Sequence, residues 1–156
     1  MHEAYTLKFA EQEDVDSWMQ MIEGVRANFP GLDTAELLEG YKQTVNKNIN
    51  RQTAICTKYE EMVVGVLLFS YNAKCLSCMA VDPKHRRKGI ATAMMDKMLS
   101  LFPDHVDITV TTFLENDDKG IAPRPLYKKF GFVEDELVEE FNYPHQKFIL
   151  HRKNED

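Results

Sequence analysis

The chain is poor in the features that mark membrane proteins, disulfide scaffolds and basic nucleic-acid binders. No apolar run reaches the roughly 18 residues that a membrane-spanning helix needs. Three cysteines, Cys56, Cys75 and Cys78, are too few and odd in number for a disulfide framework, which fits a reducing compartment. Residues 1–10 lack a basic start followed by an apolar block, so we expect no signal peptide. The expected location is the cytoplasm, by default.

The net charge and the length of the chain narrow the class of protein further. A formal net charge of −6 disfavours non-specific binding of nucleic acid by the whole surface. An acidic surface also suits a cationic ligand, although many proteins are mildly acidic without one. The apolar content of 44% is enough for folding, and 156 residues is close to the usual size of one domain. Since no repeat, low-complexity tract or linker is visible, we expect one domain over 1–156.

Hydrophobic periodicity predicts an α/β fold, a mixed α+β sheet, with elements in the order βααβββαβαββ. Strands are expected at 5–9, 53–58, 62–70, 75–81, 108–113, 132–141 and 147–151. Helices are expected at 15–25, 34–49, 89–102 and 126–130, the second with Asp33 as its cap and Glu36 at capping-box spacing. The run 63–69 is apolar throughout, which is typical of a strand covered on both faces.

The most informative segment is a basic turn between the strand at 75–81 and the following helix. It contains Asp82-Pro83, five further basic or histidine positions at 84–88, and then Gly89-Ile90-Ala91-Thr92. The first N–H groups of a helix have no helical partner, and the helix dipole adds positive charge there, so such an end suits phosphate. Gly89 and Ala91 leave room for close approach, and Arg86, Arg87 and Lys88 add charge. The plain alternative is a capped helix with a solvated basic turn. The sequence lacks the Gly-Lys-Ser/Thr ending of a Walker loop and the three spaced glycines of a dinucleotide fingerprint.

Two motifs resemble the GNAT superfamily of acetyltransferases. Arg86-x-x-Gly89-x-Ala91 matches the Arg/Gln-x-x-Gly-x-Gly/Ala pattern of its coenzyme A pyrophosphate loop, and Leu126-Tyr127 with Gly131-Phe132 matches its Leu-Tyr-x-x-x-Gly-Phe signature. The resemblance implies a GNAT-like acyl-CoA N-acyltransferase fold and acetyl-CoA as cosubstrate, without a metal. It also implies a small-molecule or peptide amine as acceptor. The cofactor-binding residues that it implies are Met79, Ala80, Val81, Arg86, Arg87, Lys88, Gly89, Ile90, Ala91, Thr92 and Asn116.

The resemblance also implies roles in catalysis. The backbone N–H of Val81 would polarise the thioester carbonyl, and Tyr127 would protonate the departing thiolate. The alternative for Tyr127 is a core aromatic residue with a satisfied hydroxyl. An ammonium acceptor with a pKa of about 10 must lose a proton first. Glu115 is the candidate base that would accept this proton. The alternative is that Glu115 is only a solvated carboxylate in a loop. Glu139 and Glu140 in the next strand are weaker candidates, and a water relay is a separate alternative.

The stretch between Asn116 and Tyr127 is longer than is usual in the superfamily, which leaves the role of Asn116 open. Residues 117–125 contain one glycine and two prolines, so we expect a flap that borders the acceptor site. The residues Trp18, Phe29 and Tyr41 are candidates for an apolar wall of that site, with core packing as the alternative. The resemblance leaves the acceptor unspecified and admits a homodimer.

Other signals are discounted. Cys75-x-x-Cys78 has redox or zinc spacing, but no second pair accompanies it, and residues three apart on a strand should face opposite sides. His105, His145 and His151 lack metal-ligand spacing. A nucleic-acid site on the basic turn is disfavoured by the net charge. Two hypotheses remain: an amine N-acetyltransferase, and a coenzyme A-binding regulatory module without turnover.

Overall fold

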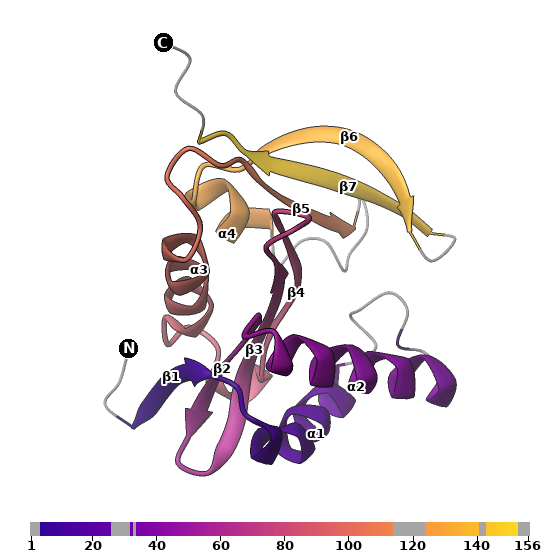
Figure 1. The fold of residues 1–156 in the computed structure, drawn as a ribbon, viewed down its shortest axis with the longest axis vertical. Coiled ribbons are helices and arrows are strands. Elements are labelled where there is room, and N and C mark those ends of the chain that lie inside the picture. Colours follow the sequence, from indigo (N-terminus) through magenta and orange to yellow (C-terminus); the bar gives the residue numbers. More distant parts are fainter. Residues whose placement is uncertain (1–3, 26–31, 33, 114–123, 141–142, 153–156) are drawn as a thin grey trace.

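The computed structural model describes residues 4–25, 32, 34–113, 124–140 and 143–152 (Figure 1). Seven strands form one sheet in the order β1-β2-β3-β4-β5-β7-β6. The elements are β1 (Tyr5–Phe9), α1 (Val15–Val25), α2 (Ala35–Asn50), β2 (Ala54–Tyr59), β3 (Met62–Ser70), β4 (Cys75–Val81), α3 (Ile90–Ser100), β5 (Ile108–Phe113), α4 (Arg124–Lys129), β6 (Val133–Glu140) and β7 (Tyr143–Leu150). The predicted order of strands and helices is confirmed. Within the described part of the chain, no helix is long and apolar enough to cross a membrane.

Three predicted boundaries are wrong. β7 begins at Tyr143 rather than 147, because 145 and 146 already pair with both β5 and β6. Thr34, not Asp33, caps α2, since its side chain accepts the Leu37 N–H at 3.1 Å. α4 begins at Arg124, so the last two residues of the expected flap belong to a helix. Pro125 fits there because the first N–H groups of a helix have no helical acceptor.

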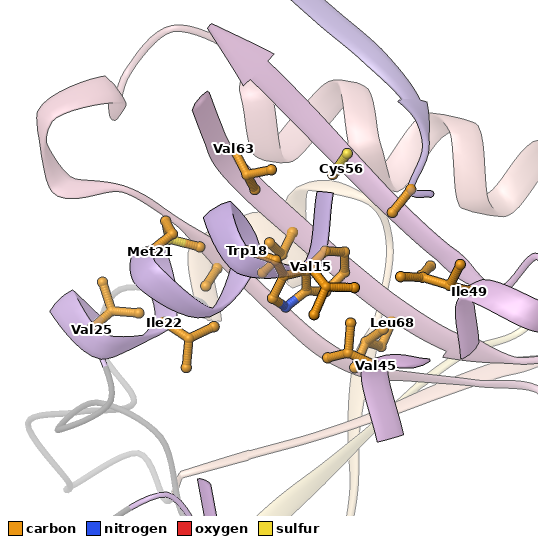
Figure 2. Packing of buried hydrophobic residues seen from close by; sticks show 14 of the residues in the cluster. Val15, Trp18, Met21, Ile22, Val25, Val45, Ile49, Cys56, Val63 and Leu68 are labelled. Atoms are coloured by element: carbon orange, nitrogen blue, oxygen red, sulfur yellow. The ribbon is translucent and has the colours of Figure 1, made fainter. Parts of the chain in front are cut away.

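The sheet carries one apolar cluster on each face. On one face, α1 and α2 pack Trp18, Ile22 and Val45 against β2 and β3 (Figure 2). On the other, α3 and α4 pack against β3, β5 and β7. Successive residues of β3 are divided between the two clusters, and those at 63–69 are buried, which confirms the prediction of a doubly covered strand. Each large side chain buried in this way contributes about 1.5–3 kcal/mol.

A buried carboxylate ties the first strand to the second. Asp14, in the single turn η1 (Gln12–Asp14), is 1% exposed and lies 3.1 Å from Lys8 Nζ and 2.9 Å from Lys58 Nζ. It also accepts the Glu11 N–H at 2.9 Å. Burial alone raises the pKa of Asp14, but these hydrogen bonds and charges outweigh burial and hold the pKa below its ordinary value. The ion-paired form is therefore the stable one.

Replacing Asp14 with asparagine should destabilise the fold by about 1–3 kcal/mol near neutral pH, because a charged acceptor of three hydrogen bonds is lost. The folded-state pKa lies below the unfolded value of about 3.9, so this contribution is complete above that value and is lost as the pH falls through the folded pKa. Urea unfolding of parent and variant at about pH 7 and about pH 2.5 measures it. A difference in unfolding free energy that persists undiminished in acid would contradict this role.

Candidate functional site

The sheet opens in the middle, where β4 separates from β5. These two strands pair in parallel only at Cys75–Thr109 and Leu76–Val110, and then diverge (Figure 1). The separation begins at a β-bulge: Leu68 pairs with Cys78, but Phe69 pairs with Leu76, so Ser77 is an extra residue. A bulge bends its strand and ends regular pairing. Among the described residues, the rest of β4 therefore has a strand neighbour on one side only.

Backbone polar groups of β4 point into this opening. The Asp82 N–H donates to the Val64 carbonyl of β3 at 2.8 Å. Because hydrogen bonding alternates along an antiparallel pair, Ala80 also directs its backbone groups at β3, whereas Met79 and Val81 direct theirs away from it. An N–H and a carbonyl from each of these two residues thus face the side that β5 has left. A ligand lying along β4 can bind there as an additional strand would.

The basic turn beside this opening has the open helix end that the sequence predicts. Gly89 is the N-cap of α3, has φ 80°, and makes no side-chain capping bond. The first helical bond runs from the Ala93 N–H to the Gly89 carbonyl at 3.0 Å, so the N–H groups of 90–92 precede the hydrogen-bonded turns. Arg87 also adopts a left-handed backbone, with φ 63°. Together with the exposed side chains at 86–88, this end is suited to a phosphate group.

Contacts missed by sequence reasoning hold the turn in place. His85, in the short turn η3 (Pro83–His85), lies 2.8 Å from the Tyr5 hydroxyl through Nδ1 and 5.1 Å from the Tyr59 ring. α3 lies so close to β3 that a Cβ on Gly65 would approach Ile90 Cγ2 at 2.7 Å. A glycine inside an apolar strand was the available signal for that approach. The turn is therefore fixed to β1, β2 and β3.

Tyr127 lies on α4 and is only 6% exposed. Its ring centroid is 6.0 Å from that of Phe132 and 5.9 Å from that of Phe148. Burial, and secondarily the charge of a Cys78 thiolate, raises the pKa of the Tyr127 hydroxyl well above its usual value. The ring thus has the core packing of the plain alternative, and its hydroxyl stays protonated over the whole range in which proteins work.

Cys78 and Tyr127 pack on opposite faces of the sheet. Cys78 belongs to the α1–α2 face, whereas Tyr127 belongs to the α3–α4 face. Cys56, Cys75 and Cys78 are free thiols. The expectation that Cys75 and Cys78 face opposite sides is wrong, because the extra residue Ser77 resets the alternation and puts both on one face.

The structure does not place several of the predicted site residues at the opening between β4 and β5. Phe29, Glu115, Asn116 and residues 117–123 lie outside the described residues. Glu139 is exposed on β6, and Glu140 ends that strand. His145, discounted as a metal ligand, is 1% exposed and pairs with Phe113 at the end of β5. Even-numbered residues of β7 belong to the α4 face, so His145 is on the same face as Cys78.

The comparisons with known proteins agree on one family. A family model described as the acetyltransferase (GNAT) domain matches residues 50–134. No curated protein matches the chain. A GNAT-family acetyltransferase from Bacillus cereus has a TM-score of 0.73 at 21% identity, over 96% of this chain and 99% of that one.

Two further solved structures have the same fold. The ribosomal-protein-S18-alanine N-acetyltransferase of Escherichia coli has a TM-score of 0.70 at 15% identity, over 97% of this chain and 96% of that one. The Microcin C7 self-immunity acetyltransferase MccE, solved with acetyl-CoA and AMP, has a TM-score of 0.67 at 12% identity, over 96% of this chain and 93% of that one.

Proposed function

The chain belongs to the GNAT acetyltransferase family, and on that premise we propose that residues 1–156 form one domain that moves the acetyl group of acetyl-CoA to a primary amine. The observation that carries the proposal is the juxtaposition of three features at one place. These are the opened strand β4, the uncapped basic end of α3, and the largely buried side chain of Tyr127. Each answers one requirement of the reaction: a thioester channel, a pyrophosphate site and a proton donor.

The pyrophosphate would bind the backbone N–H groups of 87–92, with Arg86 and Lys88 adding charge and Thr92 a hydroxyl. The pantetheine arm would then run along β4 and bond to the backbone of Met79 and Val81, as a strand does. Acetyl-CoA in the MccE structure supports acetyl-CoA as the ligand of this fold. Asn116 would add a side-chain amide to the same arm.

The acetyl group transfers in one step. The amine lone pair forms a C–N bond to the acetyl carbonyl carbon, while the Val81 N–H stabilises the charge that develops on the carbonyl oxygen. The C–S bond breaks, and its electron pair goes to the coenzyme A sulfur. The amine proton passes to a base, and the Tyr127 proton passes to the thiolate. Burial raises the pKa of Tyr127, and a thiol leaving group held in similarly desolvated surroundings would have a raised pKa too, which reduces the difference in pKa between the donor and the acceptor of this proton.

The base would be Glu115, which follows β5 by two positions in the sequence, and replacing it with glutamine should lower kcat by about 10²–10⁴ while changing the acetyl-CoA KM little. His145 is a second candidate, since it lies on the Cys78 face beside the end of β5. The pH profile separates them. Loss of the acid limb in Glu115→Gln, and not in His145→Gln, assigns the base to Glu115, and the reverse result assigns it to His145. An unchanged limb in both would leave proton removal to water.

An acceptor screen at fixed acetyl-CoA tests the function. Saturating acetyl-CoA should raise the melting temperature by mass action. Free thiol should then appear only when a suitable amine is added from a panel of polyamines, amino sugars and peptide N-termini. Binding without thiol release over the whole panel would favour the regulatory module. No thermal shift and no thiol release would contradict the proposal.

A further inference from the structure

A chain of hydrogen bonds leads from the core of the α1–α2 face to the opening in the sheet. The Trp18 Nε1–H of α1 donates to the Tyr41 hydroxyl of α2 at 3.0 Å. The same hydroxyl lies 3.5 Å from Cys78 Sγ on β4. Trp18 is fully buried, so the first member of the chain is fixed by core packing (Figure 2). Three elements are thus connected through polar atoms at the residue that follows the bulge.

The direction of these bonds determines where the thiol proton points. An indole N–H can only donate, so the Tyr41 oxygen accepts from Trp18. The Tyr41 hydroxyl keeps its own proton and a second lone pair, so it can donate to Cys78 Sγ or accept from it; when it donates, the thiol proton of Cys78 points away from Tyr41. Cys78 follows the extra residue Ser77, where β4 has already left β5.

Cys78 and Tyr127 approach the same opening from opposite faces of the sheet. A strand pairing ordinarily separates side chains on the two faces, but β4 and β5 are paired only as far as Leu76. The charge of a Cys78 thiolate is felt at the Tyr127 hydroxyl, where it raises the pKa. The proposed function places the thioester between β4 and α4, the elements that carry these two groups.

We propose that the Tyr41 hydroxyl donates to Cys78 Sγ and that Tyr41 is a positioning residue, which directs the Cys78 thiol at the reacting thioester from the side opposite Tyr127. This inference rests on the proposed function. The neutral S–H is a weak donor toward the charge that develops as the C–S bond breaks. The thiol is not an acetyl carrier: burial raises the pKa of Cys78 to about 11, and the Tyr41 hydrogen bond offsets only part of that rise. The thiolate that a covalent acetyl-cysteine route needs is therefore scarce near neutral pH.

The kinetic test is a double-mutant cycle. Tyr41→Phe and Cys78→Ala should each lower kcat by about 2–10-fold, the usual effect of one hydrogen bond, with little change in the acetyl-CoA KM. The double variant should be no slower than Cys78→Ala, because Tyr41 acts through the thiol. Cys78→Ser should keep most of the rate, since a hydroxyl also donates. The inference would be overturned if the kcat losses of the two single variants multiplied in the double variant. It would also be overturned if Cys78→Ala kept the parental kcat.

Matched controls separate positioning from folding. Tyr71→Phe removes an exposed tyrosine hydroxyl, and Cys75→Ala removes a thiol from the same strand. Both should keep the parental kcat. Melting temperatures of all variants show how much of any loss is structural. If Tyr41→Phe does not fold, Cys78→Ala and Cys78→Ser still decide whether the thiol acts on kcat.

Alkylation gives a readout that does not depend on turnover. In the Cys75→Ala background, with Cys56 fully buried, N-ethylmaleimide should modify Cys78 at about pH 9. Saturating acetyl-CoA should slow that reaction at least about 10-fold, by covering the thiol. If acetyl-CoA raises the melting temperature but leaves the alkylation rate unchanged, the inference is wrong and the proposed function stands. If acetyl-CoA does not bind at all, the proposed function itself fails.

Discussion

Tyr127→Phe is expected to lower kcat by about 10²–10⁴, the range for loss of a positioned acid. The substitution keeps the ring and its contacts with Phe132 and Phe148, and removes only the hydroxyl. The lost interaction belongs to the transition state, so the KM for acetyl-CoA should change little. The raised pKa of Tyr127 keeps the hydroxyl protonated through neutral and mildly alkaline pH, so the parental rate should show no loss of this acid below about pH 10.

Melting temperature, measured beside kcat, separates the acid from a structural residue. A core tyrosine without a catalytic role would lose stability and keep its turnover. A stable variant with near-parental kcat would remove Tyr127 from the mechanism, provided that chemistry limits the rate. Single-turnover measurements check that condition. A loss of only a few-fold would mean that water protonates the thiolate in its place.

Gly89→Val is expected to weaken acetyl-CoA binding by about 10–100-fold, which corresponds to losing one or two hydrogen bonds to charged phosphate. Apart from the two chain neighbours, no atom of the described residues lies within 4 Å of a Cβ added at Gly89, so the side chain would not clash with them. It would occupy the space in front of the α3 N-terminus. The φ of 80° also penalises a β-branched residue. Calorimetric titration with acetyl-CoA measures the Kd.

The control for Gly89→Val must carry the same backbone strain. Gly131 has φ 95° and lies in the turn between α4 and β6, away from the basic turn. Gly89→Ala and Gly131→Ala should therefore lower the melting temperature by similar amounts. Only substitutions at Gly89 should raise the Kd, and valine more than alanine. Parental affinity in a folded Gly89→Val protein would mean that the pyrophosphate binds elsewhere.

The sequence predicts those parts of the fold that depend on local patterns. Apolar alternation and helical spacing locate each strand and helix, and the glycine before α3 indicates the open helix end. The start of β7 is missed because Pro144 is a turn signal in the sequence, whereas it pairs with Glu139 in the structure. That pairing depends on where β6 and β5 lie, which is determined by the tertiary structure and not by the local sequence. Thr34 and Asp33 are both good caps, and only the backbone geometry distinguishes them.

The centre of the site is predicted only in part, because it depends on a register shift. No glycine or proline marks the bulge at Ser77; it is visible only through the pairing of β4 with β3. The chain from Trp18 through Tyr41 to Cys78 joins residues far apart in sequence, so no local spacing reveals it. Tyr127 was identifiable because a resemblance singles it out. Its burial and raised pKa required the fold.

The most direct test of acetyl transfer uses acetyl-CoA labelled with ¹³C in the acetyl group and each amine that releases thiol. Mass spectrometry of the products, with thiol counted in the same reaction, measures both halves of the transfer. The predicted result is one labelled acetyl group on nitrogen for each thiol released, with the rate reduced in Tyr127→Phe. Thiol release accompanied by labelled free acetate and no acetylated amine would contradict acetyl transfer and indicate hydrolysis of the thioester instead.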